Sequence, residues 1–330
     1  MMDWLQLTKL YIPLIAWVGS GWWLGRVLPP VIPYRLGKFL FWIGVPLSIL
    51  GFLRQADLSA SVWLAPITAW IAVGLGLSLG WIWLQIQSGW QELQTPLSHN
   101  RDGKPTLDRL LGQTLMPPSQ GSFLLSTMFG NTGYLGYPIA LALIGTQYFG
   151  WTVFYDTLGS ALSSYSVGVV LAAQFGSQMR RSIHLAVALL KNPALWSFWL
   201  GLGLRNVSLP PPIEQGLHAG AWTIVGLSLL LLGMRLSQLT SQRYLATAMI
   251  GLMIKMAIVP LLIGFGLPYL GITGTPRLAI VIQAAMPPAF ATLVLAEAYD
   301  LDRDLTVTTL ALGSLLILLT LPIWLLLFSP

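Results

Sequence analysis

The chain has 330 residues, of which 55% are hydrophobic and only 8% carry a charged side chain. Ordinary soluble domains have about a quarter of their residues charged, so this composition excludes a typical soluble enzyme. The 15 tryptophans add more large apolar surface than a globule of this size can hide from water, which makes lipid the expected solvent. The net charge of +6 does not predict a nucleic-acid partner, because the lysines and arginines are scattered and form no basic face.

Ten long stretches without acidic or basic residues divide the chain, apart from Lys255 inside one of them. A helix needs about 20 mostly apolar residues to cross a bilayer, and long basic side chains at the ends of a shorter stretch can reach the interface. The pattern therefore predicts an all-α integral membrane protein with ten transmembrane helices. The stretches are 10–25, 39–53, 58–91, 110–155, 157–179, 192–204, 215–234, 244–276, 278–296 and 305–330.

The first helix is expected near residues 5–28. It is not predicted to be a cleaved signal peptide, because it contains Trp22 and Trp23 and has no small-residue cleavage site. The longest polar stretch, 89–119, is predicted to be a linker between spans. With no cysteine in the chain, neither a disulfide nor a thiolate metal site is possible.

The basic residues predict the orientation in the membrane. If the N-terminus lies outside, most of the basic residues fall in inner loops, where Lys and Arg are enriched, so both termini are expected outside the cell (inner) membrane. The inner residues are then Arg26, Arg35, Lys38, Arg101, Lys104, Arg109, Arg180, Arg181, Lys191, Arg235, Arg243 and Arg303, and the outer ones are Lys9, Arg54, Arg205 and Arg277.

The two halves of the chain show weak, ordered self-similarity. Val45-Pro46-Leu47-Ser48 resembles Val225-Gly226-Leu227-Ser228, and Pro138 with Tyr148 resembles Pro288 with Tyr299. The separation along the chain between matching positions is smaller for the second pair of motifs than for the first, by about the length of the 89–119 linker. This difference is expected if that linker is an insertion in the first half. The pattern predicts two five-helix repeats, residues 1–175 and 176–330. Because five is odd, the second repeat must be inverted in the membrane, as in many secondary transporters.

Two predicted helices, the fourth and the ninth, contain residues that interrupt a helix. Residues 130–138 read GNTGYLGYP, and residues 283–292 read QAAMPPAFAT. Glycine adds backbone freedom and proline removes a hydrogen-bond donor, so both helices are expected to be broken. New half-helices are expected to begin at Pro138 and Pro288. An interrupted backbone at membrane depth must be buried in protein or line a polar cavity, so such breaks mark a site.

The breaks predict a site for an anion. Half-helices that begin there point their positive N-terminal ends at the break, which suits a carboxylate. Asn131 can both donate and accept through its amide, so it is expected to contact the substrate. The alternative is that the two motifs are kinks filled by a neighbouring helix. The candidate substrate-binding residues are Gly130, Asn131, Thr132, Gly133, Tyr134, Tyr137, Pro138, Gln283, Met286, Pro287, Pro288 and Thr292.

The motif at 130–138, together with Met286-Pro287-Pro288-Ala289 and the stretch 295–302, resembles the auxin efflux carrier family, as does Lys191-Asn192-Pro193. The resemblance runs over nearly the whole chain. It implies a ten-helix carrier with crossed broken helices four and nine, organic anions such as malate, malonate or auxin-like aromatic acids as substrates, elevator-type alternating access and a homodimer. It also implies that Asn131 lies at the substrate and that Pro138 and Pro288 lie at the two crossings.

One departure from the family pattern concerns the second crossing. Family members often carry an asparagine after it, whereas this chain reads Ala289-Phe290-Ala291-Thr292. The second half therefore offers fewer polar groups, and the substrate is either more apolar or differently held.

Three charged residues are candidates for coupling or charge compensation. A charge within a span is costly and usually functional, so Lys255 neutralises a substrate carboxylate, pairs with an acid, or reaches the interface. Asp156 is either a protonatable coupling group or a helix-end residue in the outer water. Glu297 is either a coupling group or a solvated capping residue. Gly76-Leu77-Ser78-Leu79-Gly80 fits a nucleophile motif, but without a nearby acid or histidine it is interpreted as helix packing.

The leading hypothesis is a secondary or facilitative transporter of small organic anions rather than an enzyme. The alternative is a membrane sensor or scaffold that keeps the carrier fold without transport, and a membrane-embedded enzyme is a third hypothesis. The sequence has no metal-ligand cluster, Walker loop or dinucleotide fingerprint. The expected partners are thus the anion and the lipid bilayer, with no cofactor.

Overall fold

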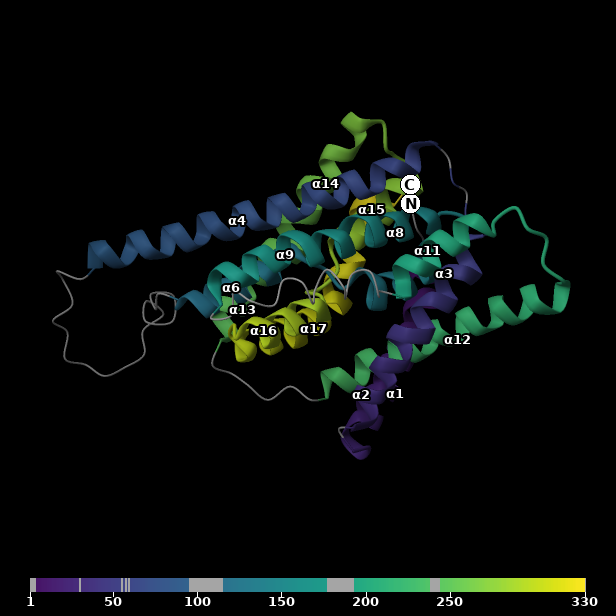
Figure 1. The fold of residues 1–330 in the computed structure, drawn as a ribbon, viewed down its shortest axis with the longest axis horizontal. Helices are drawn as coiled ribbons and strands as arrows, with labels where there is room; N and C mark the ends of the chain where they lie inside the picture. The colour runs from purple at the N-terminus through teal and green to yellow at the C-terminus, as the bar shows by residue number, and fades with distance from the viewer. Residues whose placement is uncertain are drawn as a thin grey trace.

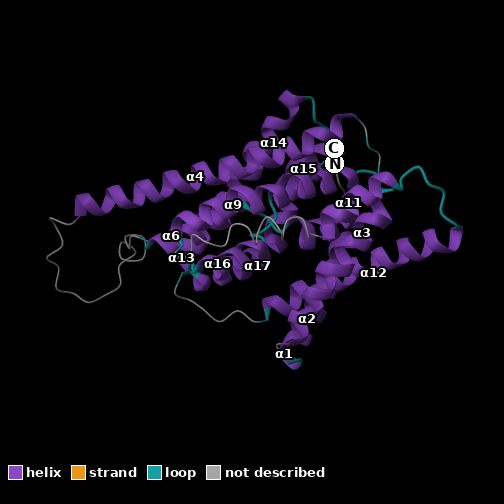
Figure 2. Cartoon of the chain, viewed as in Figure 1, coloured by secondary structure: helices purple, strands orange, loops and turns teal. Residues whose placement is uncertain are grey.

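The structure, a computed structural model, describes residues 4–94 except 30, 55, 57 and 59, and then residues 115–176, 193–237 and 244–329. Over these ranges the regular secondary structure is helical, apart from one antiparallel bridge between Gly130 and Pro288 (Figure 2). The prediction of an all-α chain is confirmed for this part of the molecule.

Six helical segments in the described ranges are long and apolar enough to cross a membrane, and each has 23 to 28 residues. They indicate a multi-pass integral membrane protein, as the composition predicts. Two shorter apolar helices, Thr132–Ile144 and Phe290–Tyr299, lie between them in the chain. The six long segments are Val31–Leu53, Ser61–Ser88, Phe149–Phe175, Pro211–Met234, Leu245–Leu270 and Arg303–Phe328.

One group of helices packs around α12 and is called here the α12 bundle (Figure 1). In it α1 runs along α12, and α3 packs against both α11 and α12. The α1–α12 contact is close because glycines meet backbone there: a Cβ atom on Gly233 would lie less than 3.0 Å from the carbonyl of Val18. The members are α1 (Trp4–Val27), α2 (Val31–Phe39), the π-helix η1 (Leu40–Gly44), α3 (Val45–Leu53), α11 (Pro193–Gly203) and α12 (Pro211–Leu236).

The remaining helices form a second group, called here the crossing bundle (Figure 1). Its core is apolar, and it meets the α12 bundle where α12 approaches α7 and α17 and where α3 approaches α8. Its first half has η2 (Ala60–Trp63), α4 (Leu64–Gln94), α6 (Pro117–Met128), η3 (Thr132–Gly136), α7 (Tyr137–Ile144), α8 (Phe149–Phe154), η4 (Tyr155–Ala161) and α9 (Leu162–Phe175). Its second half has α13 (Leu245–Met253), η5 (Ile254–Ile258), α14 (Val259–Gly266), η6 (Leu267–Leu270), α15 (Gly274–Ala284), α16 (Phe290–Tyr299) and α17 (Arg303–Phe328).

The predicted linker 89–119 is shorter than expected. Helix α4 continues to Gln94 and α6 begins at Pro117, so both ends of the segment are helical, and 95–114 lie outside the described residues. The 31 residues of α4 make a helix of about 46 Å, longer than a hydrocarbon core of about 30 Å. Helix α4 is therefore longer than one crossing requires, and one of its ends projects past the neighbouring helices (Figure 1).

Candidate substrate site at the helix crossing

Two interrupted helices meet in the middle of the crossing bundle. Helix α6 ends at Met128 and α15 ends at Ala284, and the chain after each is extended before it becomes helical again. The N–H of Asn131 donates to the carbonyl of Pro287 at 2.7 Å, and the N–H of Ala289 donates to the carbonyl of Phe129 at 2.9 Å. Each break thus supplies the hydrogen bonds that the other lacks, which is what a buried interruption in lipid requires. The prediction that both helices are broken is confirmed.

The first break lies earlier in the chain than predicted. The half-helix that follows this break begins at Thr132 rather than at Pro138. It has π geometry at first and α geometry from Tyr137 onward. The N–H of Gly136 bonds to the carbonyl of Asn131 at 3.0 Å, five residues back. This wide turn relieves the clash that a proline makes with the carbonyl four residues before it, so Pro138 is accommodated inside the helix.

The second break is also slightly displaced from its predicted position. Pro287 and Pro288 lie in the extended segment, and α16 begins at Phe290 with Ala289 as its N-terminal cap residue. The half-helix therefore starts two residues after Pro288. The cap residue Ala289 is held by its hydrogen bond to Phe129, so the crossing itself determines where α16 begins.

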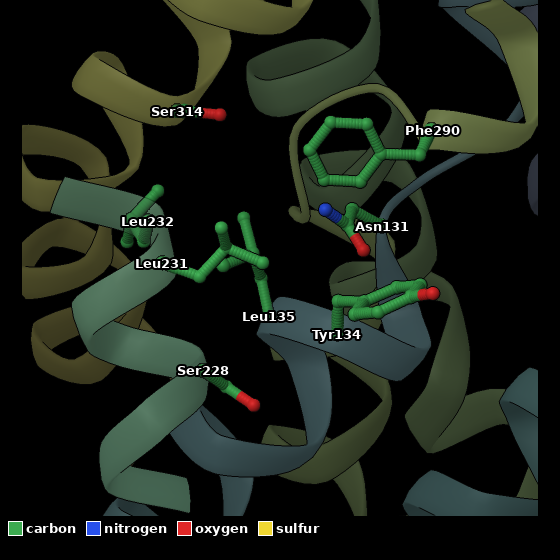
Figure 3. A pocket seen from close by; sticks show the side chains of 8 residues that line it. All are labelled: Asn131, Tyr134, Leu135, Ser228, Leu231, Leu232, Phe290 and Ser314. Atoms are coloured by element: carbon green, nitrogen blue, oxygen red, sulfur yellow. The ribbon is translucent and has the colours of Figure 1, made fainter. Parts of the chain in front are cut away.

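A narrow pocket with a cavity volume of about 10 Å³ lies beside the crossing, between the two bundles (Figure 3). One wall comes from η3, α16 and α17 of the crossing bundle, and the other comes from α12. The rings of Tyr134 and Phe290 meet edge to face, with centroids 6.0 Å apart. The amide of Asn131 lies between these two rings (Figure 3). The lining residues are Asn131, Tyr134, Leu135, Ser228, Leu231, Leu232, Phe290 and Ser314.

The Asn131 side chain is buried, with 4% of its surface exposed. Its backbone N–H bonds across the crossing, but its side-chain amide has no hydrogen-bond partner among the residues that the structure describes. The amide is not fully enclosed by protein, unlike that of Gln283, because it faces the pocket. This residue therefore has both donor and acceptor capacity available at the pocket wall.

Both half-helices begin at this pocket. The first residues of η3 and α16 follow the breaks directly, so the N-terminal ends of both half-helices face the crossing. These helix starts place two positive dipole ends beside Asn131. None of the residues that line the pocket carries a charge. The local field that acts on a bound molecule therefore comes from backbone dipoles and neutral polar groups.

Asp156 is buried behind the crossing on the π-helix η4. Its carboxylate accepts hydrogen bonds from the hydroxyl groups of Thr132 and Tyr137, the latter at 2.7 Å. A Cβ atom on Gly133 would lie 3.3 Å from Asp156 Oδ2, so the carboxylate packs directly on the start of η3. The interpretation of Asp156 as a helix-end residue in the outer water is wrong, because its side chain anchors the half-helix from inside the protein.

Lys255 is buried on another π-helix, η5, with 2% of its surface exposed. Its ammonium donates to the carbonyl of Ala284, the last residue of α15, at 2.9 Å. It does not reach the membrane interface, so that alternative is wrong. Glu297 is half exposed and forms an ion pair with Arg303 at 3.2 Å, which agrees with a solvated residue at the end of α16.

Of the twelve residues predicted to bind substrate, Asn131 and Tyr134 line the pocket, and the other ten do not. Gln283 is completely buried, and neither atom of its amide has a partner among the described residues. It packs over Gly136, where a Cβ atom would lie 2.8 Å from Gln283 Nε2. Thr292 donates to the carbonyl of Ala289 at 2.7 Å and so stabilises the first turn of α16.

The sequence did not identify the remaining lining residues as part of the site. Phe290 lies within the predicted stretch 283–292, and Ser228 belongs to the motif that the two halves share. Both residues therefore lie in motifs identified in the sequence, but neither was predicted to bind substrate. The motif Gly76–Gly80 is a packing surface as predicted, because Gly76 and Gly80 of α4 contact Thr127 of α6. Lys191 and Asn192 lie outside the described residues.

Comparisons with known proteins agree with this geometry. Residues 113–325 match the profile of a family described as membrane transport protein, and both breaks fall within the match. A protein of Methanothermobacter thermautotrophicus named an uncharacterized transporter is 32% identical over 198 residues, 59% of this chain and 63% of that relative. An uncharacterized transporter of Methanocaldococcus jannaschii is 27% identical over 209 residues, 62% of this chain and 67% of that relative.

The match to the first relative covers less than two thirds of that relative's length, at 63%. The family match itself extends over more than half of this chain and includes the crossing, the pocket residues of α12 and α17, and the two buried charges. The chain therefore belongs to the membrane transport protein family, the family of the auxin efflux carriers.

Proposed function

We propose that this protein is a secondary or facilitative transporter of small organic anions, which bind beside Asn131 at the helix crossing. The observation that carries the proposal is the buried amide of Asn131, without a partner among the described residues, at the point where two half-helices begin. The names of the two relatives support a transporter in general terms.

The chemistry of the pocket supports an anion that carries some apolar surface. Helix N-termini stabilise negative charge, typically by about 0.3–1 kcal/mol each and by more in buried sites. Asn131 and Ser228 can donate hydrogen bonds to carboxylate oxygens, while Leu231 and the ring of Phe290 offer apolar contact. The hydroxyl of Ser314 donates to the carbonyl of Leu310 at 2.7 Å. Malate, malonate and indole-acetate are the representatives that we propose to test first.

The proposal includes ten spans arranged as two inverted five-helix repeats, with α6–α7 as the fourth span and α15–α16 as the ninth. The reciprocal hydrogen bonds between the two breaks support this arrangement, because both interruptions use the same kind of extended segment before a half-helix. The orientation with both termini outside the cell membrane, and the homodimer, belong to the same proposal.

The position of the pocket supports elevator-type alternating access. The pocket lies between the α12 bundle and the crossing bundle, and its walls belong to both. If the crossing bundle moves along α12, the half-helices and their bound anion move with it, while α12 remains in place. The rival hypotheses, a sensor or scaffold and a membrane enzyme, give no reason for an amide at this junction that lacks a partner among the described residues.

Thermal stability of the purified protein tests the proposal. We expect malate, malonate or indole-acetate to raise the melting temperature in a saturable way, because a ligand that binds only the folded state stabilises it by mass action. The matched controls are the neutral amides of the same acids. Equal stabilisation by the amides, or no stabilisation by any anion of the set, would contradict the proposed anion site.

A further inference from the structure

Lys255 is a buried cation that pairs with no acidic side chain in the described part of the chain. Among the residues that the structure describes, Glu297 forms an ion pair with Arg303 at the exposed end of α16 and is not available to Lys255. The carboxylate of Asp156 is bound by the hydroxyls of Thr132 and Tyr137 on the other break segment. A buried charge is tolerated only where other groups compensate it, so the surroundings of the Lys255 ammonium explain why it is there.

The compensating group is the end of a half-helix. The ammonium of Lys255 donates to the carbonyl of Ala284 at 2.9 Å, and Ala284 is the last residue of α15. The C-terminal end of a helix carries a partial negative charge, and its last carbonyls have no partner within the helix. The ammonium therefore lies at the negative end of a helix that stops at membrane depth.

The same ammonium also reaches the other break. A Cβ atom on Gly130 would lie 3.2 Å from Lys255 Nζ and 3.2 Å from its Cε, and 3.2 Å from the carbonyl oxygen of Met286. The absence of a side chain at Gly130 thus leaves room for the lysine between the two crossing segments. The π-helical turn η5 places Lys255 there, because the extra residue of a π turn changes the direction in which its side chains project.

Interrupted helices in carriers offer such carbonyl ends to coupling cations. We propose that the ammonium of Lys255 is a tethered cation that occupies this position, so that the protein has no sodium site at the end of α15. The inference rests on the proposed function only in treating the crossing as the transport site. Its consequence is that substrate binding and transport proceed without sodium, whereas removal of the ammonium opens a position that sodium can fill.

The test measures the melting temperature of purified full-length protein in sodium chloride, potassium chloride and choline chloride at equal ionic strength. Wild type is expected to melt at the same temperature in all three salts. Lys255→Ala leaves the carbonyl oxygens at the end of α15 facing an empty space. This variant is expected to melt at a lower temperature than wild type in choline chloride. In sodium chloride its melting temperature should rise by at least about 3 °C and reach a plateau as the sodium concentration increases. Lys255→Met fills the space with apolar atoms, so it is expected to lose stability without recovery in sodium.

Lys38→Ala is the matched control, because Lys38 is exposed on α2 and its loss should change none of the salt responses. A saturable, sodium-specific stabilisation of wild type would overturn the inference, and this measurement needs no variant. Equal melting of Lys255→Ala in sodium and choline would overturn it as well. No substrate is used in this experiment, so its outcome does not depend on whether the protein binds organic anions. The proposed anion site and the proposed role of Lys255 can therefore be contradicted independently.

Discussion

Individual side chains behind the crossing hold the start of η3 in place. The carboxylate of Asp156 accepts from the hydroxyls of Thr132 and Tyr137, which lie five residues apart on η3 and α7. The amide of Gln283 packs on Gly136 from the other break. These contacts position the first turn of the half-helix, and with it the backbone N–H groups beside Asn131. We therefore expect substitutions of Asp156 or Gln283 to reduce transport although neither residue lines the pocket.

Asp156→Ala removes the acceptor of two buried hydroxyls. Each hydroxyl then keeps only a long contact of 3.4 Å, from Thr132 to the carbonyl of Gly130 and between Tyr137 and Thr157. A poorly paired buried hydroxyl costs about 1–3 kcal/mol, so we expect a clearly lower melting temperature and weak transport. Asp304→Ala is the control, because Asp304 is an exposed carboxylate in the first turn of α17 and its loss should have little effect. Differential scanning fluorimetry compares the two variants. If both melt like wild type, Asp156 does not anchor the half-helix.

Gly136→Ala tests the contact with Gln283. The new Cβ atom would lie 2.8 Å from Nε2 of Gln283, closer than real Cβ contacts allow, so either the amide or η3 must shift. We expect uptake to fall about tenfold, which corresponds to about 1.4 kcal/mol. The double variant Gly136→Ala/Gln283→Ala should recover part of the loss, because the clash is removed. Gly74→Ala, which meets nothing within 4 Å, should transport normally.

At the scale of helices, the sequence predicted the spans better than their interruptions. The first helix, predicted near residues 5–28, is α1 (Trp4–Val27), and the charge-free stretch 305–330 lies within two residues of α17 (Arg303–Phe328), because charged residues rarely enter a lipid-facing helix. The break near Pro138 was misplaced because the π turn η3, rather than the proline, determines the local geometry. Hydrogen bonds between distant segments select such a turn, so a local sequence pattern does not reveal it.

The α1–α12 contact depends on glycine at particular positions. Gly233→Ala places a Cβ atom less than 3.0 Å from the carbonyl oxygen of Val18 and 2.6 Å from the N–H nitrogen of Trp22. We expect the helices to separate and the melting temperature to fall by several degrees. Gly19→Ala on α1 meets nothing within 4 Å and removes a glycine from a helix, so it should be neutral or stabilising by up to about 1 kcal/mol. Equal melting temperatures of the two variants would contradict the claim that the close approach of α1 to α12 at Gly233 stabilises the protein.

At the scale of the whole molecule, the site is made where two bundles meet. The motif at 130–138 predicted Asn131 and Tyr134, because an interrupted helix needs a polar environment. It did not predict Ser228 or Ser314, since a single sequence does not reveal which distant helices will pack against a break. The site was thus half predicted: the sequence indicated the crossing, and only the fold shows the wall that α12 supplies.

Relative motion of the two bundles can be tested because the natural chain has no cysteine. Phe154 of α8 and Phe198 of α11 lie on opposite bundles with ring centroids 5.0 Å apart. We expect a short bifunctional thiosulfonate to join Phe154→Cys and Phe198→Cys and to stop uptake, and reduction to restore it. Each single variant controls for loss of the aromatic ring. Normal uptake by the fully cross-linked protein would contradict a moving crossing bundle.

Uptake of labelled malate, malonate and indole-acetate into proteoliposomes, compared between wild type and Asn131→Ala, tests the central claim most directly. A hydrogen bond to a charged group contributes about 1.5–3 kcal/mol, so we predict at least about a tenfold loss of anion uptake in the variant. The variant should melt near the wild-type temperature, because its missing amide has no protein partner among the described residues. Unchanged anion uptake by a correctly folded Asn131→Ala protein would contradict a substrate site at the crossing.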